Sequence, residues 1–534
     1  MRNIKKRLYK GFGFLLIVLL IISGCSSNQS VDNEASKDSS KQQSNGPKVL
    51  KVSIPGNAAH LDPHFSSSAP DLTVNQTLYN GLMRLTPGAT SVDEVEGDLA
   101  ESWENNEEGT VWTFHLRKGV QWHNGYGELT SADVKWTFER LIDSKTGSAF
   151  TEDLKHIKEI QTPDEYTVVF HLNHPDPSFL HRILIDDSVG AILKKEAIED
   201  AGKEAMVKPV GTGPFKLKEY KLNDRVVLEK NTDYFRGEPK LDGIEFIVME
   251  DQNAIDIAIE KGEIHLATGS GDALWLDKMK NKQTIEVDLV EPPLPWLLHL
   301  NQKIKPLDDI RVRQAIAHAI DMSGYVEKVY GPGVATEAKG PIASNLFGYK
   351  DMGGYEYNPE RSKELLKEAG YPNGLELPMN YVNIRPVYLN MMTFVQEELR
   401  KVGITTELKQ ADIPTYQANI RKGLNNLALH TKSFKPHAVF PMDYYFYGGS
   451  IGKANYSSYN KSDSLIEQAK VEMDSNKAEA LYAEIQQQIM DEYVVVPLIE
   501  TRSILVRRAE VDLGYDLKGT YVYSYPLYET TDLK

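Results

Sequence analysis

Cysteine is almost absent from this sequence of 534 residues, which contains one, Cys25. A single cysteine cannot form an internal disulfide. The chain also lacks an excess of positive charge, because 60 Lys and Arg residues face 76 Asp and Glu residues and give a formal net charge of −16. Nucleic-acid binders need concentrated positive charge to displace counterions. We therefore predict no nucleic-acid partner.

The N-terminal segment has the pattern of an exported protein. Basic residues without any acid come first, and they are Arg2, Lys5, Lys6, Arg7 and Lys10. The apolar run that follows, over 12–22, is too short for a membrane-spanning helix of about 20 residues and is typical of a secretory signal. It closes in Ile22-Ser23-Gly24-Cys25, which resembles the lipobox of bacterial lipoproteins. The resemblance implies a signal peptide over 1–24 and a lipid on Cys25; the alternative is an incidental cysteine after a plain signal peptide.

The next stretch carries too little apolar surface to fold. Between Ser26 and Gly46 the apolar residues are Val31 and Ala35, among mostly Ser, Asn, Gln, Asp and Lys. Such a segment cannot offset its chain entropy by burial, so we predict a flexible tether over 25–47. The folded body is expected to begin near Lys48.

The body alternates between strand and helix patterns. Apolar and polar residues alternate in several stretches, as in half-buried strands. These stretches are 50–54, 112–116 and 168–172. Thr130 and Asp133 form a capping-box pattern before one predicted helix, and Asn358 caps another that ends at Gly370. The mixture, without strict βαβ spacing, indicates an α+β or mixed α/β protein.

Prolines interrupt the body at two places that matter for its organisation. The run Glu291-Pro292-Pro293-Leu294-Pro295 is expected to break the chain before a strand over 296–300. A second apolar strand, 493–498, carries three valines into Pro497. Two extended crossings about 200 residues apart suit a chain that enters a second lobe and later returns through a hinge. The alternative is two ordinary core strands.

Motifs for catalysis or metal binding are weak or absent. Residues 448–452 match G-x-S-x-G around Ser450, but the polar, turn-forming residues that follow do not suit a nucleophile elbow. Gly211-Thr212-Gly213-Pro214 lacks the further residues of a phosphate-binding loop. The thirteen histidines include no H-E-x-x-H pair. We predict a binding protein rather than an enzyme, with no cofactor and no resident metal.

A series of motifs extends over most of the body. The first group comprises Leu-Ala-Glu-Ser-Trp at 99–103, Trp-Thr-Phe-His-Leu-Arg-Lys-Gly-Val at 112–120, Trp-His-Asn-Gly at 122–125 and Leu-Thr-Ser-Ala-Asp-Val at 129–134. The later group comprises Pro-Val-Gly-Thr-Gly-Pro-Phe at 209–215, Asn-Thr-Asp-Tyr-Phe at 231–235, Gly-Glu-Ile at 262–264, Pro-Leu-Asp-Asp-Ile-Arg-Val-Arg-Gln-Ala at 306–315 and Tyr-Asn-Pro-Glu at 357–360. In this order they resemble the family 5 extracellular solute-binding proteins, the dipeptide, oligopeptide and nickel receptors of ABC importers.

This resemblance implies an α/β fold with two lobes that close on a ligand, a clamshell like the type II periplasmic binding proteins. An extra subdomain, at about 80–205, is inserted in the larger lobe. The expected boundaries are 48–292 for the larger lobe, 293–499 for the second lobe, and 500–534 for the return to the larger lobe.

The resemblance also suggests ligand-binding residues. Arg385, in Asn-Ile-Arg-Pro, resembles the arginine with which the dipeptide receptors hold a ligand carboxylate. Asp443 matches the later aspartate of their binding loop, whereas the aspartate that pairs with the peptide amino group is missing. Lys435 and His437 occupy the loop instead. A cation there would repel a desolvated ammonium, so longer peptides or an anionic ligand suit the site better.

The predicted function is a lipid-anchored receptor on the extracellular face of a bacterial cell membrane, delivering peptides to the permease subunits of an ABC importer. We expect a monomer whose ligand is a peptide or other small solute. The alternative within the family is a receptor for nickel or for a metal-chelate or opine-like ligand, with His430 and His437 as possible imidazole ligands. Two further alternatives are an exported hydrolase using Ser450 and an adhesive surface protein.

Overall fold

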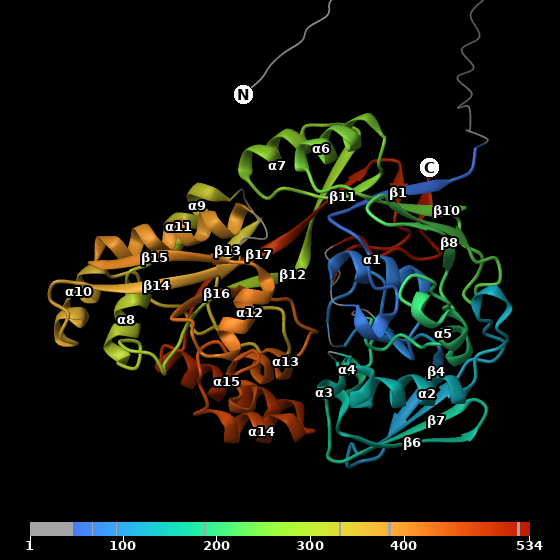
Figure 1. Cartoon of the computed structure of the whole chain (residues 1–534), viewed down its shortest axis with the longest axis horizontal. Helices are drawn as coiled ribbons and strands as arrows, with labels where there is room; N and C mark the ends of the chain where they lie inside the picture. Colours follow the sequence, from blue (N-terminus) through green and yellow to red (C-terminus); the bar gives the residue numbers. More distant parts are fainter. Residues whose placement is uncertain are drawn as a thin grey trace, which may run out of the picture. The chain divides into compact units, whose positions relative to one another are not determined.

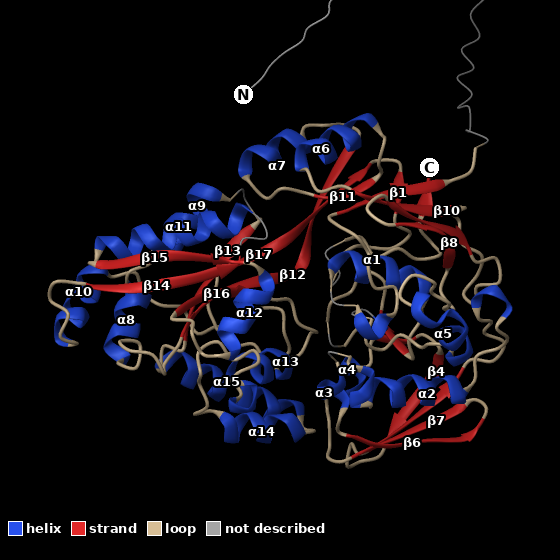
Figure 2. Ribbon diagram, in the orientation of Figure 1, coloured by secondary structure: helices blue, strands red, loops and turns tan. Residues whose placement is uncertain are grey.

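Strands from distant parts of the chain meet in one large sheet (Figures 1 and 2). The computed structural model describes residues 46–534 except 67, 92, 149, 186–187, 331–332, 383–385 and 521–523. Residues 47–534 form one compact unit. The predicted signal peptide and nearly all of the tether, with Cys25, lie outside the described residues.

The order of the large sheet is β15-β14-β16-β12-β17-β11-β1-β10-β9-β8, and β13 pairs with β17 outside this path. Its strands are β1 (Val49–Ile54), β8 (Phe215–Lys221), β9 (Arg225–Lys230), β10 (Gly243–Val248), β11 (Leu266–Thr268), β12 (Ile285–Leu300), β13 (Ala335–Glu337), β14 (Leu375–Val382), β15 (Ile404–Ala411), β16 (Leu427–Thr431) and β17 (Val495–Arg508). β1 confirms the strand predicted at 50–54. Parallel and antiparallel pairs are mixed, since β1 runs parallel to β10 while β12 runs antiparallel to β17.

The two longest of these strands cross the middle of the sheet together. β12 and β17 pair from Ile285 with Arg508 to His299 with Val495, which confirms the two strands predicted at 296–300 and 493–498. Their role as a hinge between lobes stays a prediction. The predicted break at residues 291–295 is wrong, because β12 continues through the prolines. The register shifts between Val290 and Leu294, and this irregularity accommodates prolines that cannot donate ladder hydrogen bonds. Pro497 likewise lies inside β17, opposite Leu297.

A smaller antiparallel sheet has the order β4-β5-β7-β6. Its strands are β4 (Ala100–Asn105), β5 (Val111–Leu116), β6 (Ile157–Asp164) and β7 (Thr167–Leu172). β5 and β7 confirm the strands predicted at 112–116 and 168–172. Two-stranded pairs complete the description: β2 (Met83–Leu85) with β3 (Val95–Gly97), and β18 (Val511–Asp512) with β19 (Asp532–Leu533).

Two helices begin at the capping residues predicted from the sequence. Thr130 and Asp133 form the capping box of α2, and the Asn358 side chain accepts a hydrogen bond from the Arg361 backbone N–H at the start of α10. The helices are α1 (Ala69–Leu78), α2 (Ser131–Ile142), α3 (Thr151–Leu154), α4 (Phe179–Arg182), α5 (Lys195–Ala201), α6 (Gln252–Lys261), α7 (Ala273–Lys280), α8 (Ile310–His318), α9 (Met322–Val329), α10 (Pro359–Glu368), α11 (Pro386–Lys401), α12 (Ile413–Arg421), α13 (Val439–Pro441), α14 (Asp463–Val471) and α15 (Ser475–Asp491). Within the described part, none of them combines the length and apolar character needed to cross a bilayer.

The buried side chains separate into clusters by region of the chain. Two clusters are built entirely from residues 296–499. Another is built from residues 82–192 around the four-stranded sheet, and the remaining two combine residues 50–290 with Val334 and strand β17 or the C-terminal segment. We name the first group the second lobe and the rest the larger lobe. The boundaries at 292/293 and 499/500, and the limits of the subdomain, stay predictions.

Candidate functional site

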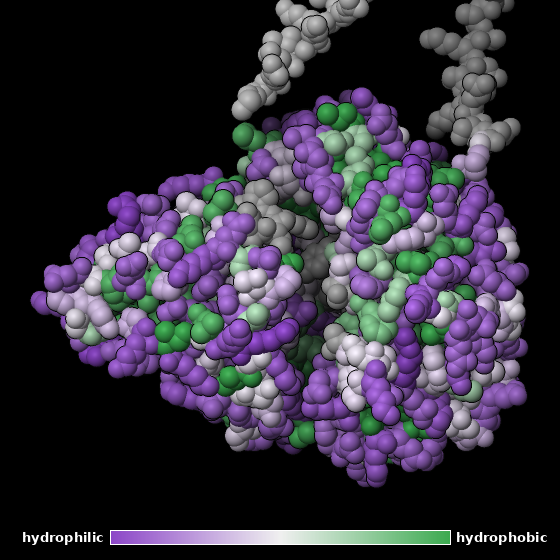
Figure 3. All heavy atoms as spheres, in the orientation of Figure 1, coloured by the Kyte–Doolittle hydropathy of each residue, from purple (hydrophilic) through white to green (hydrophobic). Residues whose placement is uncertain are grey.

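Parallel strands of the second lobe end at one edge of the large sheet. β14 runs parallel to β16, with Asn380 paired to Ala428, and the strands end at Val382 and Thr431. In α/β proteins, ligands commonly bind outside the carboxyl ends of parallel strands. Figure 3 shows that the surface is hollowed between the two lobes. This edge is therefore the candidate site.

An aromatic group is fixed at this edge by hydrogen bonds. Trp296 pairs across the strands with Thr431, and its indole Nε1 donates to Thr501 Oγ1 at 3.0 Å. The Trp296 ring centroid lies 4.8 Å from that of Tyr388 on α11. The Tyr388 hydroxyl lies 2.7 Å from Thr431 Oγ1. Four elements are thus held in one wall, and neither Tyr388 nor Thr431 was predicted from the sequence, because the group forms only when β12, β16, β17 and α11 meet.

The loop after β16 contains two lysines, Lys432 and Lys435, which follow Thr431 in the sequence. The Lys432 ammonium lies 5.5 Å from the ring centroids of both Phe434 and Tyr444, within the range of a cation–π contact. Lys435, a predicted ligand-binding residue, instead donates from Nζ to the backbone oxygen of Arg182 at 2.8 Å. Lys435 therefore connects the second lobe to the larger lobe in this structure. Its contact with a ligand stays a prediction.

His430 and His437 occupy separate surroundings. His430 Nδ1 lies 2.7 Å from the Tyr445 hydroxyl, whereas His437 Nδ1 accepts from the Val439 N–H at 3.1 Å and its ring packs on Phe347. Burial is the main reason that the pKa of each imidazole falls to about 3. The positive charge of Lys432 lowers the pKa of His430 further, and His181 lowers that of His437 further. Among the described residues, no group of three His, Cys, Asp or Glu side chains could hold a metal ion. This geometry gives no support to a shared nickel site at these two histidines.

Asp443 is already paired within the chain. Its carboxylate forms an ion pair with Lys470 of α14, and the Lys470 ammonium lies 3.9 Å from the ring centroid of Tyr447. The Asp443 backbone oxygen accepts a hydrogen bond from Ser450 Oγ at 2.6 Å. Ser450 ends a short 3-10 helix, Gly448–Ser450, rather than occupying a strand-to-helix turn, so the residues around it do not form a nucleophile elbow.

Arg385 lies outside the described residues, between β14 and α11 in the chain. Of the four predicted ligand-binding residues, the structure thus describes Asp443, Lys435 and His437. It places His437 and Lys435 at the contact between lobes and Asp443 beside α14. The ligand-binding roles of all four stay predictions.

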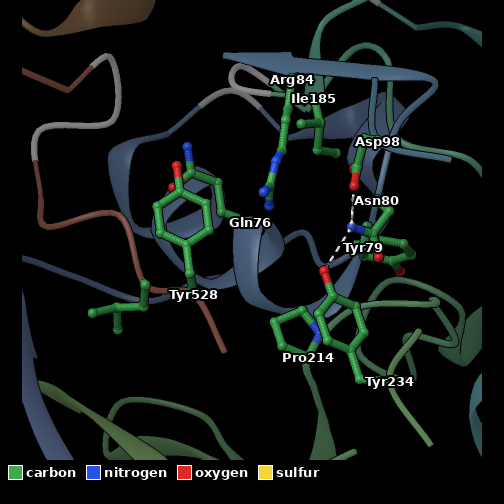
Figure 4. Close-up of a pocket in the computed structure, with 10 residues that line it drawn as sticks. Gln76, Tyr79, Asn80, Arg84, Asp98, Ile185, Pro214, Tyr234 and Tyr528 are labelled. Carbon is green, nitrogen blue, oxygen red and sulfur yellow. Dashed lines mark hydrogen bonds between the residues drawn. The ribbon is translucent and has the colours of Figure 1, made fainter. Parts of the chain in front are cut away.

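A polar cavity of about 30 Å³ lies in the larger lobe (Figure 4). Asn80 Nδ2 donates to both oxygens of Asp98, at 2.9 and 3.0 Å, and lies 3.2 Å from the Tyr234 hydroxyl. The buried Arg84 guanidinium faces the same space and donates from Nε to Glu96 at 2.7 Å. The cavity has room for water but not for a peptide, so this charged network is a structural feature of the lobe.

The comparison with protein families identifies the chain. The model of the bacterial extracellular solute-binding proteins, family 5, matches residues 94–457. The chain belongs to this family. A curated relative, the dipeptide-binding protein of Escherichia coli, is 29% identical over 476 residues, which cover 82% of this chain and 86% of that protein.

Solved structures of family 5 proteins agree with this fold. MoaA from A. tumefaciens R10, in complex with mannopinic acid, is 33% identical with a TM-score of 0.83, covering 92% of this chain and 100% of its own. DppA from Helicobacter pylori, in complex with the peptide STSA, is 28% identical with a TM-score of 0.79, covering 91% and 98%. The predicted two-lobe α/β fold of the type II binding proteins is thereby confirmed. The family comprises solute-binding proteins of transport systems, described as extracellular.

Proposed function

We propose that this family 5 protein is the substrate-binding component of an ABC importer and captures peptides between its two lobes. The observation that carries the proposal is the arrangement of the candidate site: an aromatic wall at the carboxyl ends of β14 and β16, beside the surface hollow between lobes joined by β12 and β17. The relatives named for dipeptide and peptide binding support the choice of ligand.

In the proposed mechanism the two lobes close around a solute and do not convert it into another compound. A solute that contacts both lobes stabilises the closed form by its difference in affinity for the closed and open forms. The paired strands β12 and β17 connect the lobes, so changes in their backbone angles can act as the hinge. The permease then distinguishes the closed receptor from the open one. The bound solute leaves unchanged.

Arg385 supplies the recognition of a carboxylate in this proposal. A planar guanidinium binds a carboxylate through two parallel hydrogen bonds, which gives both energy and orientation. Replacing Arg385 with Ala should weaken binding of a carboxylate-bearing solute about tenfold or more, as measured by isothermal titration calorimetry. Arg400→Ala is the matched control, since Arg400 pairs with Glu397 on the exposed face of α11. An unchanged dissociation constant in Arg385→Ala would remove this residue from the site.

A second candidate ligand is an anionic, opine-like solute. The specific observation is that the Asp443 carboxylate already forms an ion pair with Lys470, which disfavours Asp443 as the partner of a ligand ammonium group. The mannopinic acid complex of MoaA supports an anionic solute. Titration with mannopinic acid, with Ser-Thr-Ser-Ala and with its N-acetylated form separates the candidates. Heat from the free peptide alone would exclude the anionic candidate.

The proposed location is the extracellular face of the cell membrane, with the protein attached through a lipid on Cys25. Two or more acyl chains give stable anchoring, at about 0.8 kcal/mol for each buried methylene. Anchoring near the permease raises the effective concentration of the receptor there. We further propose that the receptor works as a monomer.

A further inference from the structure

Two segments more than 250 residues apart in sequence meet across the lobes. The first, residues 176–182, includes α4 of the larger lobe, and the second, residues 435–440, includes part of α13 of the second lobe (Figure 1). Lys435 Nζ donates to the backbone oxygen of Arg182 at 2.8 Å. The guanidinium carbon of Arg182 lies 5.1 Å from the ring centroid of Phe440. We name these two segments the latch.

The larger-lobe side of the latch is fixed by its own contacts. Arg182 Nε donates to Asp176 Oδ2 at 2.7 Å, and both side chains are largely buried. Asp176 also accepts from the Ser178 N–H and Oγ, at 2.9 and 2.7 Å, and lies 3.0 Å from His156 Nε2. Arg182 is therefore held in place, and its guanidinium lies over the Phe440 ring without a further loss of side-chain freedom.

The second-lobe side is fixed in the same way. The Phe347 N–H donates to the Pro436 oxygen at 3.1 Å, and the Ala438 N–H donates back to the Phe347 oxygen at 2.9 Å. The His437 ring packs 4.9 Å from that of Phe347 and 6.2 Å from that of His181 across the lobes. Because both sides are ordered in advance, most of the favourable energy of their contact remains available for docking.

The latch does not include the aromatic wall of the candidate site. Trp296, Tyr388 and Thr431 do not belong to it, and its contacts join groups of the chain itself. Cation–π contacts and hydrogen bonds from charged donors are favourable, and more so when they are partly desolvated. Because the latch contacts form only when the lobes are together, they shift the balance toward closure.

We propose that the latch between residues 176–182 and 435–440 holds the lobes partly closed without a solute and thereby raises the affinity of the candidate site. The apparent dissociation constant equals the intrinsic one divided by the closed fraction, so a receptor that is already partly closed binds more tightly. The gain in affinity rests on the proposed function, because it requires closure around a solute. The closed population without solute does not.

The test measures the distance between lobes by double electron–electron resonance. Spin labels are placed on exposed positions, Glu159→Cys in β6 and Glu479→Cys in α15, in the full chain with Cys25→Ser. The protein is unfolded in guanidinium and refolded beforehand to remove any bound solute. We expect a short-distance population in this protein, and a fall of about tenfold in the ratio of short to long distances on adding Phe440→Ala.

A matched control uses the same kind of contact within one lobe. The Arg236 guanidinium carbon lies 5.5 Å from the Phe235 ring centroid, and both residues belong to the larger lobe. Phe235→Ala should leave the interlobe distances unchanged. Arg182→Lys is the second latch variant; it keeps a cation for Asp176 but removes the guanidinium that lies over Phe440, and it should also shift the population toward long distances.

Two results would overturn the latch: long distances alone in the unsubstituted protein without solute, or distributions in Phe440→Ala and Arg182→Lys equal to those of Phe235→Ala. Addition of Ser-Thr-Ser-Ala or mannopinic acid tests the proposed function separately. If the latch variants open but neither solute restores short distances or gives heat on titration, the latch stands and the assignment of ligand fails.

Discussion

Two glycines of the larger lobe, Gly211 and Gly213, allow their loop to lie directly against the backbone at the end of α1. A Cβ added at Gly211 would lie 1.9 Å from the backbone oxygen of Leu78, at the end of α1. The neighbouring Gly213 also lies against Leu78, and its backbone oxygen lies 2.9 Å from His123 Nε2. The motif that resembles a phosphate loop is therefore a site of close backbone packing, which explains the need for glycine without any ligand.

Replacing Gly211 with Ala should destabilise the protein by about 2–3 kcal/mol, because the new methyl group collides with backbone that cannot rotate away. Urea unfolding measures the change. Gly56→Ala is the control, since its Cβ would meet Pro70 at an ordinary 4.0 Å, and we expect a change within about 0.5 kcal/mol. Equal effects of the two substitutions would contradict the packing explanation.

Buried histidines make stability depend on pH. The pKa of His430 and of His437 is about 3 in the folded protein, mainly because burial disfavours the charged ring, against about 6.5 in the unfolded chain. Between these values the unfolded chain binds more protons than the folded protein. The contribution of each ring to stability is therefore full above pH 6.5 and falls by about 1.4 kcal/mol per pH unit toward pH 3.

We expect the slope of unfolding free energy against pH, averaged between pH 6.5 and 5, to be smaller in His437→Phe by about 1 kcal/mol per unit. The comparison of slopes is independent of any constant loss of packing. Lys363→Gln on the exposed face of α10 is the control and should leave the slope unchanged. A full slope in His437→Phe would mean that this ring does not remain neutral when folded.

Helices and strands of this protein differ in how far their bounds follow from their own sequence rather than from contacts with other elements. The Asn358 cap, Pro359 in the first turn and Gly370 beyond the end fix α10 from its own sequence, and the structure confirms that helix. β12 is the opposite case. Its prolines predict a break, yet the strand continues because β17 and β16 pair along its length and the register shift near Leu294 accommodates the interruption.

Replacing Asn358 with Ala should cost about 1 kcal/mol, because the Arg361 N–H loses its acceptor at the start of α10. The midpoint of urea unfolding reports the loss. Glu364→Ala on the exposed face of the same helix removes a surface ion pair with Arg361 and should cost no more than about 0.5 kcal/mol. An effect of Asn358→Ala as small as that of Glu364→Ala would show that the cap contributes little.

At the scale of the whole molecule, function depends on how two lobes are joined and where the chain is attached. The lobes share β12 and β17 and meet again at the latch. The proposed attachment is at Cys25, which lies outside the described residues. In the proposed function, capture of a solute and anchoring near the permease therefore depend on separate parts of the chain.

Replacing Cys25 with Ser should release the protein from the membrane fraction of expressing cells, because no thiol remains to carry the lipid. Immunoblotting of membrane and soluble fractions measures the shift, and the isolated body should bind solute as before. Ser26→Ala is the control and should stay with the membrane. Equal membrane association of Cys25→Ser would contradict the lipid anchor.

Local patterns were enough to predict the strands at 50–54, 112–116 and 168–172, the caps of α2 and α10, and the family resemblance of the motifs over 99–134. Each depends on periodicity, on hydrogen bonds between near neighbours or on short motifs. The folded chain was needed to show that Trp296, Tyr388 and Thr431 form one wall, that Lys470 forms an ion pair with Asp443, and that Arg182 contacts Phe440. These contacts join residues that lie tens to hundreds of positions apart, and their pairing follows from sheet order and burial rather than from local pattern.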